Sequence, residues 1–115
     1  MTTASLLTRS TIRAASMLGL DDEELGRAIG VSVNEIDDLR REARLIDQGT
    51  DAGGRGLLLI RLLQALDSLV GANPKLRGDW LRAFDQGVGA TPITLLSTPA
   101  GLTKVVEHLE SRVSR

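Results

Sequence analysis

The sequence predicts an all-α protein: a helical bundle in which an N-terminal helix-turn-helix-like module precedes a second helical domain. Its length of 115 residues fits one domain, or a small module with a second one appended. Hydrophobic residues make up 42% and charged residues 25%, close to the average of globular proteins, so a packed core is expected. No segment alternates apolar and polar residues for long enough to indicate a strand, whereas several segments begin with residues that cap helices.

The composition limits the chemistry available to the chain. It has no Cys and one His, which excludes disulfides, thiolate zinc sites and Cys nucleophiles. The single His108 has no evident acid–base partner in the sequence. Three clustered glycines, Gly53, Gly54 and Gly56, lack the Lys-Ser/Thr ending of a phosphate loop. We therefore expect no enzyme activity and no catalytic, cofactor or metal site.

The charge is small but unevenly divided. The net charge is −1, with −3 in residues 1–50 and +2 in residues 51–115. Neither half has the strongly basic character that is typical of a nucleic-acid-binding surface. The first residues lack the pattern of a secretory signal, and Arg61 interrupts the longest apolar stretch. We expect a cytoplasmic protein without a membrane partner.

The first two helices are predicted from caps and apolar spacing. After a frayed start, a first helix ends at Gly19, and its apolar positions are Ile12, Ala15, Met17 and Leu18. A second helix begins at Asp21, where the Asp21 side chain and Glu24 form a capping box. Gly30 is expected to end it.

A third helix and the turn before it complete the N-terminal module. Ser32 and Glu35 repeat the capping box. From Asp21 to Arg44 the spacing is that of a helix-turn-helix, in which a glycine turn lets the second helix cross the first steeply. The pattern is formed by Leu25, Ile29, Gly30, Val31, Ile36 and Leu39. It predicts a helix-turn-helix-like module over residues 1–46, although two packed helices joined by a glycine turn also fit.

DNA binding by this module is an open alternative. The candidate DNA-binding residues on the third helix are Val33 and Asn34 near its start and Arg40, Arg41 and Arg44 at its far end. Asp37 and Asp38 would also face DNA and would repel the phosphates, which provide most of the affinity. Weak or partner-assisted DNA binding and no DNA binding therefore carry equal weight.

The middle of the chain changes sharply in composition. Residues 47–56 contain four glycines, and we expect a loop or linker there because glycine disfavours helix. Residues 57–70 are apolar on nearly every side, which predicts a buried central helix. Its narrow polar stripe consists of Arg61, Gln64, Asp67 and Ser68. Asn73 and Pro74 are expected to end it.

Three shorter segments follow. A short helix is predicted by apolar residues spaced as helical neighbours, Trp80, Leu81 and Phe84. After glycines at positions 87 and 89, Thr91-Pro92 and Thr98-Pro99 each combine a cap with a first-turn proline and open a further helix. The last helix has an apolar stripe of Leu102, Val105, Val106, Leu109 and Val113. Trp80, the only Trp, fits either a core position or an interface.

The order of these features matches a known arrangement. A long apolar helix is followed by Trp80-Leu81, the glycines of residues 87–89, Thr91-Pro92, Leu95-Leu96, Gly101, Val105 and Leu109. This order resembles the toxin-binding domain of Xre/MbcA/ParS-type antitoxins, in which a helix-turn-helix-like module precedes that domain, as here. The chain has Phe84-Asp85 where the family often has Pro-Asn, and Ala90 where it has a second glycine.

The resemblance implies an antitoxin of a type II toxin–antitoxin system, which neutralises a RES-type toxin that consumes NAD. It implies a toxin-binding helical domain over residues 57–115 and a C-terminal segment, residues 108–115, that approaches the toxin's active site. The same segment also fits an ordinary solvated helix end. The implied toxin-binding residues are Trp80, Leu81, Phe84, Thr91, Pro92, Leu95, Gly101, His108, Arg112 and Arg115.

The resemblance also implies the partners. These are the cognate toxin and operator DNA, the latter bound mainly by the toxin complex, with a homodimer or hetero-oligomer as the assembly. The alternative function is a small helix-turn-helix transcriptional regulator whose C-terminal half serves dimerisation, and a structural adaptor is a third. An adjacent reading frame for a RES-type toxin would favour the antitoxin.

Overall fold

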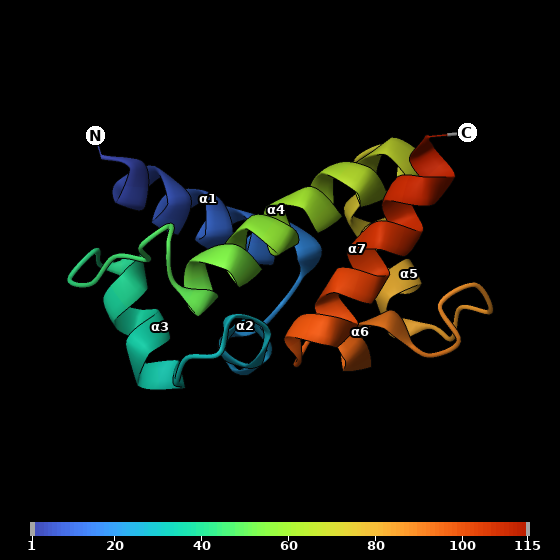
Figure 1. The fold of residues 1–115 in the computed structure, drawn as a ribbon. Helices are drawn as coiled ribbons and strands as arrows, with labels where there is room; N and C mark the ends of the chain where they lie inside the picture. The colour runs from blue at the N-terminus through green and yellow to red at the C-terminus, as the bar shows by residue number, and fades with distance from the viewer. Residues whose placement is uncertain (1, 115) are drawn as a thin grey trace.

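The computed structural model describes residues 2–114, and within that range the chain is a bundle of seven α-helices without a strand (Figure 1). The all-α prediction is therefore confirmed. The helices are α1 (Thr3–Leu18), α2 (Asp22–Ile29), α3 (Val33–Arg40), α4 (Asp51–Val70), α5 (Pro74–Arg82), α6 (Pro92–Leu95) and α7 (Pro99–Val113).

Helix α4 forms the centre of the bundle. It makes its most extensive contacts with α7 and α1, and Figure 1 shows α1–α3 around one half of α4 and α5–α7 around the other. Three of its leucines, Leu59, Leu62 and Leu66, are fully buried. The predicted central helix is therefore present. No single helix in the described range is long and apolar enough to cross a membrane, whereas α4 and α5 pass that test as a pair bent by 109°.

Helix α1 begins earlier than its apolar pattern indicated. The predicted frayed start is wrong, because Thr2 caps α1 by accepting a hydrogen bond from the Ser5 N–H at 3.1 Å. Leu7 and Thr8 in these first turns are buried, and the Thr8 hydroxyl accepts a hydrogen bond from the Ile46 N–H at 2.8 Å. The early turns are thus held by contacts with the segment before α4. Gly19 ends α1 at a φ of 75°, as predicted.

The two capping boxes are confirmed. At the start of α2, Asp21 and Glu24 bond each other's backbone N–H groups, and Ser32 and Glu35 do the same at the start of α3. Gly30 ends α2 at a φ of 79°. The apolar residues Leu25, Ile29, Ile36 and Leu39, which were expected to face inward, are all buried.

The predicted loop over residues 47–56 is correct only as far as Thr50. Helix α4 begins at Asp51, and the Thr50 hydroxyl accepts from the Gly53 N–H at 3.1 Å. A Cβ atom at Gly53 would collide with the Asp47 carbonyl, and one at Gly56 would lie 2.6 Å from the Thr11 hydroxyl. Because these glycines permit close packing, the packing and the cap offset a helix penalty of about 1 kcal/mol per glycine.

Three boundaries after α4 also differ from expectation. Gly71 caps the end of α4, while Asn73 and Pro74 begin α5 rather than end α4. Helix α5 ends at Arg82, so Phe84 follows the predicted short helix instead of lying in it. Thr91 precedes α6 without a side-chain cap, whereas Thr98 caps α7 as predicted.

Two arginines of α5 join the two halves of the bundle. Arg77 donates hydrogen bonds to the Asp67 carboxylate and to the Met17 carbonyl, and Arg82 donates to Glu24 and to the Gly19 carbonyl. The carbonyls at the C-terminus of α1 carry partial negative charge, which the two guanidinium groups complement.

Candidate partner-binding surface

The loop after α5 and the last turns of α7 line an open surface hollow of about 530 Å³. Three of the predicted toxin-binding residues, Phe84, His108 and Arg112, meet there. The remaining lining residues are Asp85, Gln86, Gly87 and Ser111. The structure therefore brings together residues from two segments that are more than twenty positions apart in the chain.

Asp85 lies at the centre of this arrangement. Its carboxylate accepts one hydrogen bond from the Trp80 indole N–H, at 3.2 Å, and another from the Val88 backbone N–H, at 3.0 Å. His108 Nε2 lies 3.7 Å from one carboxylate oxygen, and the Arg112 guanidinium lies 4.0 Å from the other. One carboxylate thus contacts both segments.

The surroundings keep Asp85 ionised. The Val88 backbone N–H holds the pKa of Asp85 below its ordinary value, while partial burial acts in the opposite direction. The charge of His108 and the Trp80 N–H lower this pKa further. Asp85 is therefore a carboxylate at neutral pH.

His108 and Gly87 fit against each other. A Cβ atom at Gly87 would lie 2.9 Å from His108 Nε2, so a larger residue at this position would displace the imidazole. The Nε2 atom is itself buried and has no hydrogen-bond partner. His108 is thus held beside Asp85 by close packing against Gly87.

Phe84 and Trp80 differ in exposure. Phe84 is 67% exposed, the highest value among the exposed large hydrophobic residues of the described chain. Trp80 is half-buried and packs against the core while its N–H bonds Asp85. The structure places the Trp80 ring against the core, and its indole N–H bonds Asp85, a residue that lines the hollow.

The other predicted toxin-binding residues lie outside the hollow. Leu81 and Pro92 are buried, so their side chains are not exposed on this surface. Thr91, Leu95 and Gly101 are half-buried around α6 and the start of α7. Arg115 lies outside the described residues.

The candidate DNA-binding residues lie on and just after α3, at the other end of the bundle (Figure 1). Val33 and Asn34 are exposed at the start of α3. Each of the three arginines pairs with carboxylates: Arg40 with Asp22 at 2.6 Å, Arg41 with Asp38 at 2.7 Å and with Asp37 at 3.2 Å, and Arg44 with Glu35 at 2.6 Å. Their positive charge is therefore largely compensated within the protein.

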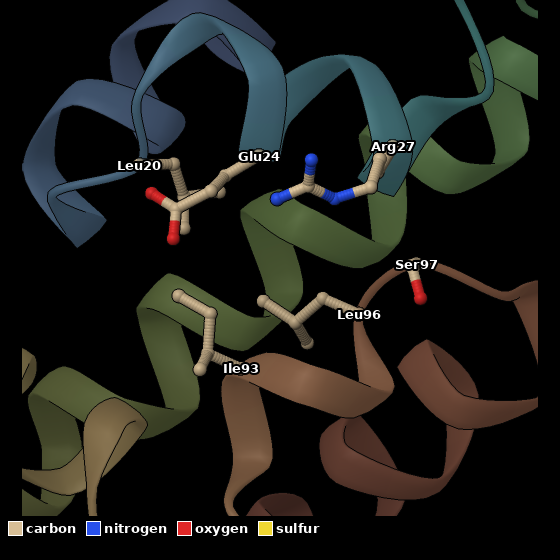
Figure 2. Close-up of a pocket in the computed structure, with 6 residues that line it drawn as sticks. All are labelled: Leu20, Glu24, Arg27, Ile93, Leu96 and Ser97. Carbon is tan, nitrogen blue, oxygen red and sulfur yellow. The ribbon is translucent and has the colours of Figure 1, made fainter.

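A second, smaller pocket lies between the two halves of the bundle. Figure 2 shows Leu20, Glu24 and Arg27 facing Ile93, Leu96 and Ser97 across it. Its volume is about 20 Å³, which suffices for about one water molecule. This pocket is too small for an organic ligand.

Sequence reasoning missed Asp85, Gln86, Gly87 and Ser111. A signal was available for Asp85, because Asp followed by glycines favours a turn in which its side chain bonds a later backbone N–H. No sequence pattern near Asp85 indicates its contacts with His108 and Arg112 of α7, which are more than twenty positions away.

The comparisons with known proteins add no family assignment. No protein-family model matches this chain, and a search of curated proteins finds no match either.

Proposed function

We propose that the protein is the antitoxin of a type II toxin–antitoxin system and that it binds a RES-type, NAD-consuming toxin in the cytoplasm. The surface formed by the loop after α5 and the end of α7 makes the principal contact. The exposed ring of Phe84 beside the Asp85 hollow is the observation that carries the proposal. The resemblance of residues 57–115 to antitoxin toxin-binding domains names the class of partner.

An exposed aromatic ring favours a protein partner. Burying a Phe side chain contributes about 1.5–3 kcal/mol, and aromatic residues bordered by polar groups are typical of interface centres. Phe84 is bordered by the polar side chains of Gln86, Ser111 and Arg112. This combination is that of an interface core with a polar rim.

The end of α7 supports the proposed means of inhibition. Leu109 is the last buried residue, and α7 continues for another turn to Val113, which is 40% exposed. Arg112 projects from this turn and is 46% exposed. The core does not need this last turn, so the segment that carries Arg112 can cover the toxin's nucleotide pocket.

The N-terminal module would regulate the operon by binding operator DNA. The ion pairs of the α3 arginines favour weak DNA binding by the free protein. A homodimer or a hetero-oligomer with the toxin would present two modules at once, and linked sites raise avidity about 10²–10⁴-fold. Operator binding by the toxin complex then provides autoregulation.

The alternative function is a transcriptional regulator with a C-terminal dimerisation half. The exposure of Val33 and Asn34 at the start of α3, the position of a recognition helix, favours it. Co-expression with the product of the adjacent reading frame, followed by co-purification, separates the two. A stable complex that consumes no NAD supports the antitoxin, whereas a protein that ignores this product and binds operator DNA alone supports the regulator.

A further inference from the structure

The Asp85 carboxylate connects two segments that each carry an exposed group. On the loop side it accepts hydrogen bonds from Trp80 and Val88. On the α7 side it lies within ion-pair distance of His108 and Arg112. Removing this carboxylate would leave the loop and the end of α7 without their shared partner.

We propose that Asp85 is the positioning residue of the partner surface: it holds Phe84, His108 and Arg112 in one preformed arrangement that fits a protein with an apolar pocket bordered by a carboxylate. The inference rests on the proposed function, because it assumes that this surface binds a protein.

The backbone around Asp85 restricts Phe84. The Asp85 N–H donates to the Ala90 carbonyl at 3.1 Å, and the Gly89 N–H donates to the Asp85 carbonyl at 2.8 Å. With the side-chain bonds to Trp80 and Val88, these contacts fix the residue next to Phe84 through both its backbone and its side chain. The backbone next to Phe84 therefore needs little further ordering when the ring binds.

The charges on the α7 side indicate the partner's chemistry. Arg112 lies 4.0 Å from the Asp85 carboxylate and forms no hydrogen bond with it, so its donors are available to a second carboxylate. His108 lies beside the same carboxylate, so the loop and α7 present Arg112 from a fixed neighbourhood. The unused donors of Arg112 favour an acidic group on the partner next to the pocket that receives Phe84.

The test is a double-mutant cycle measured with the toxin that the proposed function requires, purified as the product of the adjacent reading frame. We expect Phe84→Ala to weaken binding about 30-fold, as removal of an interface hot spot does. Asp85→Asn should weaken it about 10-fold or more, because the amide has one acceptor oxygen where the carboxylate uses two, and it carries no charge. If Asp85 acts partly by placing Phe84, the loss of affinity in the double variant should be clearly smaller than the product of the two single losses.

Trp80 supplies a readout that needs no partner. As the only Trp, it reports by its fluorescence and its indole N–H resonance on the hydrogen bond to Asp85. Asp85→Asn should shift both signals while the helical circular dichroism stays unchanged. Should Asp85→Asn fail to fold, Trp80→Phe removes the indole donor together with part of the ring and is expected to weaken toxin binding several-fold while circular dichroism shows the helices intact.

Two controls match the variants in chemistry. Leu76→Ala removes an exposed apolar side chain at the other end of α5, and Asp79→Asn neutralises an exposed carboxylate of the same helix. Both should bind like the wild type. Two outcomes would overturn the role of Asp85 and leave the proposed function standing. One is that the losses of affinity in Phe84→Ala and Asp85→Asn multiply in the double variant, and the other is that Asp85→Asn binds with wild-type affinity. A wild-type protein that does not bind the toxin overturns the proposed function and this inference with it.

Discussion

Arg77 is 4% exposed, and its guanidinium donates hydrogen bonds to both carboxylate oxygens of Asp67, near the end of α4. A third bond reaches the Met17 carbonyl in the last turn of α1. One side chain of α5 therefore connects α4 with the end of α1. Truncating Arg77 leaves the largely shielded Asp67 carboxylate and the Met17 carbonyl at the end of α1 without their hydrogen-bond donor.

We expect Arg77→Ala to lower the melting temperature by about 10 °C or more, since breaking a buried ion pair is strongly destabilising. Lys75→Ala is the matched control, because Lys75 pairs with Asp79 in solvent on the same helix. Its effect should stay below about 2 °C. Thermal melts followed by circular dichroism measure both, and similar shifts for the two variants would contradict the structural role of Arg77.

A second prediction concerns the glycines of α4. Gly56→Ala should destabilise the fold by about 1–3 kcal/mol, because the new methyl group would lie 2.6 Å from the Thr11 hydroxyl. Gly54→Ala is the control within the same helix. A Cβ atom there meets nothing within 4 Å, so the variant should gain about 0.5–1 kcal/mol from helix propensity. Urea unfolding distinguishes the opposite signs, and Thr11→Ala should restore part of the loss in Gly56→Ala.

The same glycines show how far sequence patterns reach. The starts of α2 and α3 follow from residues three positions apart, Asp21 with Glu24 and Ser32 with Glu35, and the sequence predicts them correctly, whereas α3 ends at Arg40, before the predicted Arg44. The start of α4 depends on Gly56 packing against α1, so local propensity gives the wrong answer there. Asp85 was missed for a related reason, because its contacts with His108 and Arg112 bring distant segments together.

A third prediction concerns acid stability. The hydrogen bonds from Arg82 hold the pKa of Glu24 below its ordinary value of 4.5, and the Asp21 N–H and the charge of Arg27 add to this, while burial opposes it. A carboxylate with a lowered folded-state pKa contributes stability that is complete above its unfolded pKa and is lost as the pH falls through the folded value. The melting temperature should therefore decrease as the pH is lowered below about 4.5.

Glu24→Gln tests this, because glutamine preserves the capping box but cannot ionise. The variant should melt lower than the wild type at neutral pH and approach it in acid. Glu23→Gln, on an exposed residue 4.0 Å from Arg27, should follow the wild-type pH dependence. Parallel curves for Glu24→Gln and the wild type would show that the Arg82 contact contributes nothing.

A fourth prediction concerns DNA. The free protein should bind non-specific duplex DNA at or beyond the weak end of about 10⁻⁴ to 10⁻⁶ M at physiological salt. The combined Asp37→Asn and Asp38→Asn substitutions remove two negative charges and release Arg41 from both partners, which should tighten binding about tenfold. Fluorescence anisotropy with a labelled duplex measures the change. The same charge change at a distance, Asp79→Asn with Glu107→Gln, should have a much smaller effect, and equal effects would show that α3 does not approach the DNA.

The last prediction separates binding from inhibition at the end of α7. Deleting residues 111–115 leaves Leu109, the last buried residue, in place, so the fold should melt within about 3 °C of the full chain. Phe84 and the Asp85 loop are untouched, so the truncated protein should still co-purify with the toxin, with affinity reduced about tenfold by the loss of Arg112. If the C-terminal segment covers the toxin's nucleotide pocket, NAD consumption should persist in that complex.

The full-length Arg112→Gln variant serves as the control for this truncation, because it loses the same charge but keeps the segment's length. It should bind as weakly as the truncated protein and still inhibit at saturation, since the segment can occupy the pocket without Arg112. An NAD-turnover assay on the purified toxin with each form gives the answer. Equal inhibition by the truncated and full-length proteins at saturating concentration would mean that the antitoxin acts from a surface remote from the active site, by distorting the toxin or blocking its assembly, and that the end of α7 is an ordinary solvated helix end.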